Sequence, residues 1–193
     1  MTAEPDNEGQ DNHFLGVRHS LWSALSGFLA VTGAVVGVVG IVFAGYQYLR
    51  QVEADRAEQT LNLIDIWETR GYREDFKGLR DGVQNFLSKV PPADLEAARQ
   101  NALVSRNLRD RLLSEVLGTE ENQERLNDVI YFFNRLGLCI EADLCSRETA
   151  AIFFDDSLTN FLSHFEPVIS SRRETDKGYA EGVLLLRSAI EQN

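Results

Sequence analysis

The longest apolar run in the chain covers residues 21–49 and contains no Asp, Glu, Lys or Arg. About 20 apolar residues in a helix cross a hydrocarbon core of about 30 Å, and a helix satisfies its own backbone hydrogen bonds in lipid. Trp22 lies near one end of the run, and Tyr46 and Tyr48 lie near the other, where amphipathic rings suit the two membrane interfaces. The pattern therefore predicts a transmembrane helix over residues 21–49, with these three residues as interface anchors.

A cleaved signal peptide and a buried core helix are the alternatives for this run. A signal peptide has a basic start and an apolar stretch of only ~7–15 residues, whereas residues 1–20 form an acidic tail that we expect to be disordered. A core helix of a soluble protein would carry a polar face, which the run lacks. We therefore favour the transmembrane interpretation.

Small residues recur on one side of the predicted span. Gly33, Gly37, Gly40 and Ala44 are spaced by four, three and four positions, so they share a helix face. Such faces let two helix backbones approach closely in lipid. We expect this packing face to mediate self-association or docking to another membrane protein, although glycine and alanine are also common in transmembrane helices generally.

Basic residues are more frequent after the span than before it. Only Arg18 precedes the span, and several arginines and a lysine follow it: Arg50, Arg56, Arg70, Arg73, Lys77 and Arg80. The positive-inside rule then places the C-terminal domain in the cytoplasm and the N-terminal tail outside. Cys139 and Cys145 would be free thiols in that compartment, because a disulfide would require an oxidising space.

The remaining chain, residues 50–193, has apolar positions at helical spacing and no sustained alternation of period two. Short polar connections between helices are typical of an α-helical bundle, so the predicted fold is all-α, with a single N-terminal transmembrane helix that continues into a soluble bundle. The predicted helices cover residues 50–68, 72–90, 93–104, 107–117, 120–140 and 177–191, and a further helix begins at residue 147 and continues past Pro167.

Several local signals support these helices. Thr119 and Ser146 are expected to cap the two helices that they precede, and Pro167 should kink the second of these. In the helix that follows the span, the apolar face is expected to hold Val52, Ala57, Leu61, Ile64 and Trp67.

The net charge of −11 makes nucleic acid an unsuitable partner, because an acidic surface repels phosphates. No phosphate-binding, dinucleotide-binding, zinc-protease or nucleophile-elbow motif occurs in the sequence. Cys139, Cys145 and His164 do not have the spacing of a zinc site, and the acidic pairs Asp155–Asp156 and Glu141–Asp143 fit solvated helix surfaces. We therefore expect no enzyme activity, no metal and no cofactor.

Arg172 and Arg173 are expected to lie near a helix C-terminus, where cations interact favourably with the helix dipole. The alternative is that they bind an anionic lipid headgroup or a phosphate.

Residues 126–173 resemble an uncharacterised bacterial family of membrane-anchored helical proteins, the domain of unknown function 4760. The matching positions are Phe133, Leu136 and Gly137 at the end of one helix, then Phe161 in place of a tryptophan, Pro167 and Arg172. The segment 141–143 departs from the glycine-containing turn of the family. The resemblance implies a membrane-anchored α-helical domain without an assigned activity, and it carries over no catalytic residue.

These features together suggest an interaction or scaffold protein of the bacterial inner membrane. It would contact membrane lipid and either bind a protein partner or self-associate through its span. The alternative is an accessory subunit of a larger respiratory, transport or defence complex in the same membrane. An enzyme with an unrecognised helical site is the remaining alternative.

Overall fold

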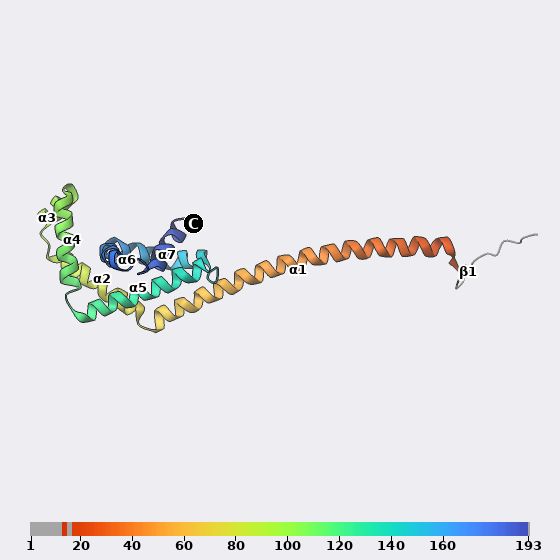
Figure 1. Cartoon of the computed structure of the whole chain (residues 1–193), viewed down its shortest axis with the longest axis horizontal. Coiled ribbons are helices and arrows are strands. Elements are labelled where there is room, and N and C mark those ends of the chain that lie inside the picture. The colour runs from red at the N-terminus through yellow and green to blue at the C-terminus, as the bar shows by residue number, and fades with distance from the viewer. Residues whose placement is uncertain (1–12, 15–16, 193) are drawn as a thin grey trace, which may run out of the picture. The chain divides into compact units, whose positions relative to one another are not determined.

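The structure is a computed structural model that describes residues 13–14 and 17–192, with side-chain surroundings at residue 32 and from residue 35 onward. The chain divides into two compact units, Met1–Gln51 and Val52–Asn193. Figure 1 labels the elements, whose bounds are β1 His13–Phe14, β2 Val17–Arg18, α1 His19–Thr69, α2 Tyr72–Lys89, α3 Pro92–Gln100, α4 Ala102–Val116, α5 Glu120–Glu141, α6 Arg147–Thr175 and α7 Glu181–Glu191.

The first unit holds β1, β2 and the N-terminal part of α1. The two-residue strands pair antiparallel, with His13 opposite Arg18 and Phe14 opposite Val17. Most of the acidic tail predicted to be disordered lies outside the described residues. α1 is long and apolar enough to cross a membrane in the segment Val35–Thr69, and no residue in its most apolar window is buried inside the structure.

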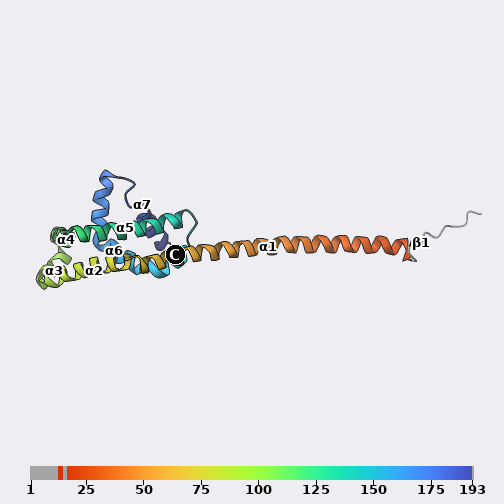
Figure 2. The ribbon, with the colours of Figure 1, turned by 90° about the horizontal axis from the view of Figure 1, so that it is seen from below.

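The second unit consists of helices, and the prediction of an all-α fold with one long apolar N-terminal helix is confirmed. α5 packs along α7 and α2, while α3 and α4 form a helical hairpin. In Figures 1 and 2 the α3–α4 hairpin lies at the opposite end of this unit from the turn that joins α5 to α6. α1 ends at Thr69, and Gly71 follows with a φ of 89°, a conformation that glycine adopts without strain.

Aromatic side chains fill the core of the second unit. The Trp67 ring lies 4.7 Å from the Phe132 ring and 5.4 Å from the Phe133 ring, measured between centroids. Phe154 and Phe161 extend the cluster from α6. Tilted and edge-on pairs at these distances add stabilisation beyond the area that they bury. Residues from α1, α5 and α6 therefore share one core.

Two helix boundaries differ from the sequence-based prediction. The break predicted near residue 105 falls at Asn101, whose side chain accepts hydrogen bonds from the backbone N–H groups of Leu103 and Val104 and so caps α4. The last helix begins at Glu181 rather than at residue 177, because Ala180 takes a left-handed conformation with a φ of 54°. The caps predicted at Thr119 and Ser146 are confirmed.

The apolar face predicted for the helix after the span is partly wrong. Leu61 is half exposed, whereas Thr60 and Leu63 are buried beside Ile64 and Trp67. Residues 60, 63, 64 and 67 follow the three- and four-residue spacing of one helix face. The buried face therefore includes a threonine, which an apolar pattern alone does not identify.

α5 and α7 cross with their backbones in contact at two glycines. A Cβ atom placed on Gly137 would overlap the carbonyl oxygen of Gly182, and one placed on Gly182 would overlap the carbonyl oxygen of Asn134. The backbone N–H of Gly182 donates a hydrogen bond of 2.7 Å to Asn134 Oδ1. Gly137 is a position of the family resemblance, and its role in the fold is this close helix crossing.

Candidate functional site

The small-residue face of α1 is uncovered wherever its surroundings are described. Gly37, Gly40 and Ala44 are exposed, and a Cβ atom placed on Gly37 or Gly40 would meet nothing within 4 Å. The surroundings of Gly33 lie outside the described residues. The arrangement leaves room for a second helix, and the association of this face with a partner remains a prediction.

The same part of α1 exposes its large apolar side chains. Val36, Ile41 and Phe43 are 65%, 74% and 58% exposed, respectively. Tyr46 and Tyr48 are exposed at the end of the run, and the Tyr46 hydroxyl accepts a hydrogen bond of 2.9 Å from Arg50 Nε. Trp22, the predicted anchor at the other end, has side-chain surroundings outside the described residues. The described residues thus present an apolar helix surface that ends in a tyrosine–arginine pair, an arrangement that suits a membrane interface.

Beyond Gln51, α1 contacts the turn between α5 and α6, which we call the disulfide turn (residues 139–146). The backbone N–H of Ser146 donates a hydrogen bond of 2.8 Å to Thr60 Oγ1, and Thr60 Oγ1 donates to the carbonyl oxygen of Arg56. Arg56 Nε donates to the carbonyl oxygen of Asp143 at 2.8 Å, and the two side chains form an ion pair at 3.5 Å. These polar contacts hold α1 against the disulfide turn.

Cys139 and Cys145 form a disulfide in the structure, so the prediction of free thiols is wrong. Asp143 has a φ of 58° and reverses the chain after α5. Leu144 and Cys145 both donate backbone hydrogen bonds to the carbonyl oxygen of Cys139. The reversal brings the two Cα atoms to 5.3 Å, a separation that a disulfide spans.

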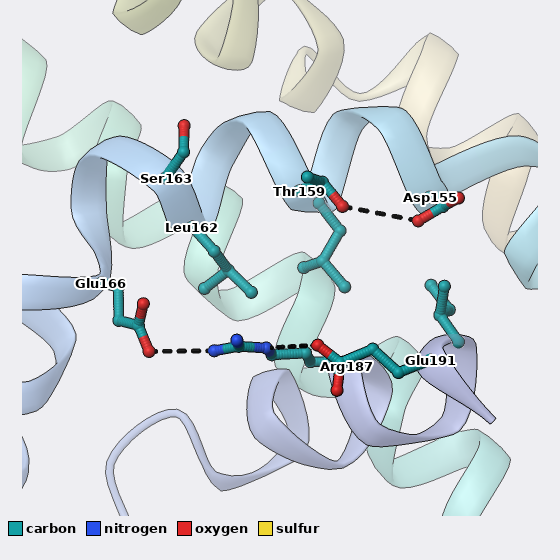
Figure 3. Close-up of a pocket in the computed structure, with 9 residues that line it drawn as sticks. Asp155, Thr159, Leu162, Ser163, Glu166, Arg187 and Glu191 are labelled. Carbon is teal, nitrogen blue, oxygen red and sulfur yellow. Dashed lines mark hydrogen bonds and ion pairs between the residues drawn. The ribbon is translucent and has the colours of Figure 1, made fainter.

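A cavity of about 230 Å³ lies between α6 and α7. Figure 3 shows the guanidinium group of Arg187 between the carboxylates of Glu166 and Glu191, with hydrogen bonds of 2.9 Å and 2.8 Å, respectively. The lining combines apolar residues with this charged group and with small polar side chains: Asp155, Leu158, Thr159, Leu162, Ser163, Glu166, Arg187, Ile190 and Glu191.

The polar side chains of this cavity have hydrogen-bond partners within the protein. The hydrogen bond to Glu191 and the charge of Glu166 raise the pKa of Arg187, which keeps the guanidinium group charged. The hydroxyl group of Ser163 donates its hydrogen bond to the backbone carbonyl oxygen of Asn160, in the same helix. The cavity can hold a small amphipathic group.

The acidic and basic pairs predicted from the sequence have structural partners. Asp143 pairs with Arg56, and Asp155 accepts a hydrogen bond from Thr159. Arg172 donates to Asn127 Oδ1 and to the Tyr179 hydroxyl, both at 2.6 Å, in the last turn of α6. Arg173 donates to the carbonyl oxygen of Tyr179 at 2.7 Å. Both arginines thus hold the connection between α6 and α7.

A groove with basic side chains runs along α2. Arg73, Lys77 and Arg80 follow the four- and three-residue spacing of one helix face. They line the groove together with Trp67, Glu74, Phe76 and Ser157. Arg73 also pairs with Glu68 at 3.5 Å. The lining thus carries three cations and one carboxylate, in a chain with a net charge of −11.

His164 gives the second unit a dependence on pH. Burial lowers the pKa of His164, so the unfolded chain binds this proton more readily than the folded chain. The free energy of unfolding should therefore decrease as the pH falls through about 6.5, the ordinary value for histidine. Thermal unfolding of the full chain in detergent, followed between about pH 7.5 and pH 5, should show this decrease in Tm, and His164→Gln should reduce it.

Asp75 also has a shifted pKa, so its effect on the pH dependence of stability must be separated from that of His164. Burial, together with the charge of Asp128, raises the pKa of Asp75, and Arg125 partly opposes the shift. A raised carboxylate pKa acts in the opposite direction, because the folded chain then binds its proton more readily. The effect of Asp75 is common to both proteins, so it cancels in the difference between wild type and His164→Gln. Parallel curves for the two proteins would contradict the assignment to His164.

The contacts that join α1 to the disulfide turn are not predicted by the sequence. Thr60 and Ser146 are 86 positions apart, and Arg56 and Asp143 are 87 positions apart, so no local pattern connects them. The two cysteines six positions apart were a usable signal for a local disulfide. The orientation predicted from Lys and Arg argues against that disulfide.

Comparisons with curated proteins and with solved structures gave no match. A family model described as "Domain of unknown function (DUF4760)" matches residues 34–180. The match includes most of the exposed apolar part of α1 and the helices up to the start of α7. The chain therefore belongs to the DUF4760 family.

Proposed function

We propose that the protein is a membrane-anchored interaction module that acts by binding rather than by catalysis. The observation that carries this proposal is the exposed apolar surface of α1, on which Val36, Ile41 and Phe43 are each more than half exposed. Burying such a surface in acyl chains is favourable, and leaving it in water is costly. Membership of the DUF4760 family is consistent with the proposal, because the function of this domain is unknown and no reaction is assigned to it.

Within the bilayer, the proposed binding face is formed by Gly33, Gly37, Gly40 and Ala44. The exposure of Gly37, Gly40 and Ala44 supports this proposal, because two backbones can approach there without a clash of side chains. The partner is a second copy of the chain, which has the same face to offer. Leucine at Gly37 would separate the two backbones and weaken the dimer.

Crosslinking in native membranes tests this face. We expect a crosslinked dimer for the wild type and a several-fold smaller dimer fraction for Gly37→Leu. Gly45→Leu is the matched control, because Gly45 lies on a different side of the same helix and has equally open surroundings. Equal dimer fractions for Gly37→Leu and Gly45→Leu, or a monomeric wild type, would contradict the proposal.

The alternative function is that of an accessory subunit in a larger complex of the bacterial inner membrane. The basic groove of Arg73, Lys77 and Arg80 favours this alternative, because it could receive an acidic surface of another protein. Purification in mild detergent separates the two functions. A scaffold that self-associates gives a homodimer, whereas an accessory subunit brings a different protein at fixed stoichiometry.

We propose that the second unit lies in the cytoplasm and the N-terminal tail outside. Arg50 and Arg56 follow the apolar run closely, and this supports the orientation by the positive-inside rule. Disulfides in the cytoplasm are usually transient, catalytic or redox-sensing. A reporter enzyme fused after residue 193, active only on one side of the membrane, tests the orientation.

A further inference from the structure

The disulfide turn combines a covalent link with the polar contacts of α1. The disulfide joins the last turn of α5, at Cys139, to Cys145, which immediately precedes the cap residue Ser146 of α6. Ser146 is also the residue whose backbone N–H reaches Thr60 on α1. The covalent closure of the turn and its contact with α1 therefore share one short segment.

The contact between α1 and the disulfide turn rests on hydrogen bonds more than on packing. A cavity of about 470 Å³ lies beside it, lined by residues 53, 56 and 57 of α1 and by residues 140, 143 and 145–149. Thr60 is the one buried polar side chain in the described part of the chain, and its hydroxyl group is satisfied by this contact. Apolar packing of α1 begins further along, at Leu63, Ile64 and Trp67.

A contact of this kind is sensitive to the geometry of the turn. Hydrogen bonds weaken steeply with misalignment, and a buried hydroxyl left without its partner is costly. If the turn relaxes, Arg56 and Thr60 lose their polar partners, so residues 53–62 of α1 are no longer held against the turn, while residues 63–69 keep their apolar packing. The disulfide is the covalent restraint that keeps the turn in place.

The two sulfur atoms differ in their surroundings. Cys139 is partly exposed, whereas Cys145 is buried, with 4% of its surface exposed. An incoming thiolate therefore reaches Cys139 Sγ more easily. The sulfur of Cys145 is then the leaving group, and it lies just before the N-terminus of α6, where the helix dipole stabilises a negative charge.

We propose that the Cys139–Cys145 disulfide is a reversible redox-modification site, which a protein dithiol of the Cys-x-x-Cys class reduces, and that its reduction releases residues 53–62 of α1 from the disulfide turn. Such a dithiol belongs to the reducing cytoplasm. The inference thus rests on the proposed cytoplasmic orientation, and it does not depend on the association of the spans.

The reaction is a thiol–disulfide exchange in two steps. The thiolate of the reductant attacks Cys139 Sγ, forms a mixed disulfide with it and expels Cys145 as a thiolate, which takes up a proton. The second thiol of the reductant, as its thiolate, then attacks its own sulfur in the mixed disulfide and expels Cys139 as a thiolate, which is also protonated. The disulfide gains two electrons and two protons, and the dithiol becomes a disulfide.

Amide hydrogen exchange on the full chain in mild detergent tests the proposal. The protein is compared as isolated and after treatment with thioredoxin or dithiothreitol, and thiol alkylation followed by mass measurement confirms the redox state. We expect exchange in residues 53–62 to rise roughly tenfold on reduction, because this part of the helix loses the tertiary contacts that oppose its local unfolding. Exchange in residues 72–89, which form α2, should not change.

Two variants separate the disulfide from its effect on α1. Cys139→Ser combined with Cys145→Ser should show the faster exchange permanently and should not respond to the reductant. Thr60→Val keeps the cysteines and removes the hydroxyl group, so it should already exchange faster when oxidised and respond less to reduction. Circular dichroism establishes that both variants remain helical, and Thr60→Val alone decides the test if the cysteine variant unfolds.

Equal exchange of residues 53–62 in the oxidised and reduced protein would overturn the proposal. So would a disulfide that the dithiol reduces only after the protein is denatured. These outcomes are distinct from failure of the proposed function, because a monomeric chain could still show the redox response. A second unit placed outside the cell by the fused reporter enzyme would overturn the orientation, and with it the encounter with a cytoplasmic dithiol.

Discussion

Replacing Phe154 by alanine is expected to lower the free energy of unfolding of the second unit by about 3–5 kcal/mol. Phe154 is 2% exposed, and its ring lies 5.7 Å from the Trp67 ring and 5.4 Å from the Phe132 ring. Truncation removes the transfer free energy of the ring and leaves a cavity that the surrounding rings cannot fill without moving. Urea unfolding of the full chain in detergent, followed by far-ultraviolet circular dichroism, measures the loss.

The adjacent residue provides the matched control. Phe153 follows Ile152 on the exposed side of α6 and is 52% exposed, so Phe153→Ala should change the free energy of unfolding by no more than about 0.5 kcal/mol. The two variants remove the same atoms from neighbouring positions. Equal losses for Phe153→Ala and Phe154→Ala would show that the core is not organised around Trp67 as described.

Replacing Gly182 by alanine should destabilise the second unit by about 3 kcal/mol or more, although it adds a single methyl group. The added Cβ would overlap the carbonyl oxygen of Asn134, which belongs to the backbone of α5 and cannot rotate away. α7 must therefore shift outward and lose the hydrogen bond from the Gly182 N–H to Asn134 Oδ1. A loss of this size should lower the Tm by about 6–12 °C.

Gly82→Ala is the control for this substitution. Gly82 lies inside α2, where the added Cβ would make an ordinary contact of 3.4 Å with Val116. Alanine is a better helix former than glycine by up to about 1 kcal/mol, so Gly82→Ala should leave the Tm unchanged or raise it. A Tm that is equally unaffected by Gly182→Ala would mean that α5 and α7 do not cross through their backbones.

The elements that local patterns govern were predictable from the sequence. Thr119 and Ser146 cap helices because of an interaction within three residues, and the apolar stripe of α5 depends only on helical spacing. The break at Asn101 was missed, although asparagine is a common cap residue, because the apolar pattern around it is weak. Local rules thus give the helices and leave some of their ends uncertain by several residues.

Contacts between distant segments were not predictable in the same way. Nothing near Gly137 indicates that its partner is Gly182, and nothing near Thr60 indicates a hydrogen bond to Ser146. Ile152 and Phe153 are large and apolar, which by itself predicts burial, yet both are exposed. Which face of a helix is buried depends on its neighbours, and a single sequence does not specify these neighbours.

The contact between α1 and the disulfide turn also affects how the chain is made. Ser146 leaves the ribosome 86 residues after Thr60, a delay of roughly 4–17 s at ordinary rates of protein synthesis. Leu63, Ile64 and Trp67 have no partners from α5 until Phe132 and Phe133 emerge, and none from α6 until after Ser146. Nascent chains of this protein should therefore need protection by a chaperone at this helix until α5 and α6 have emerged.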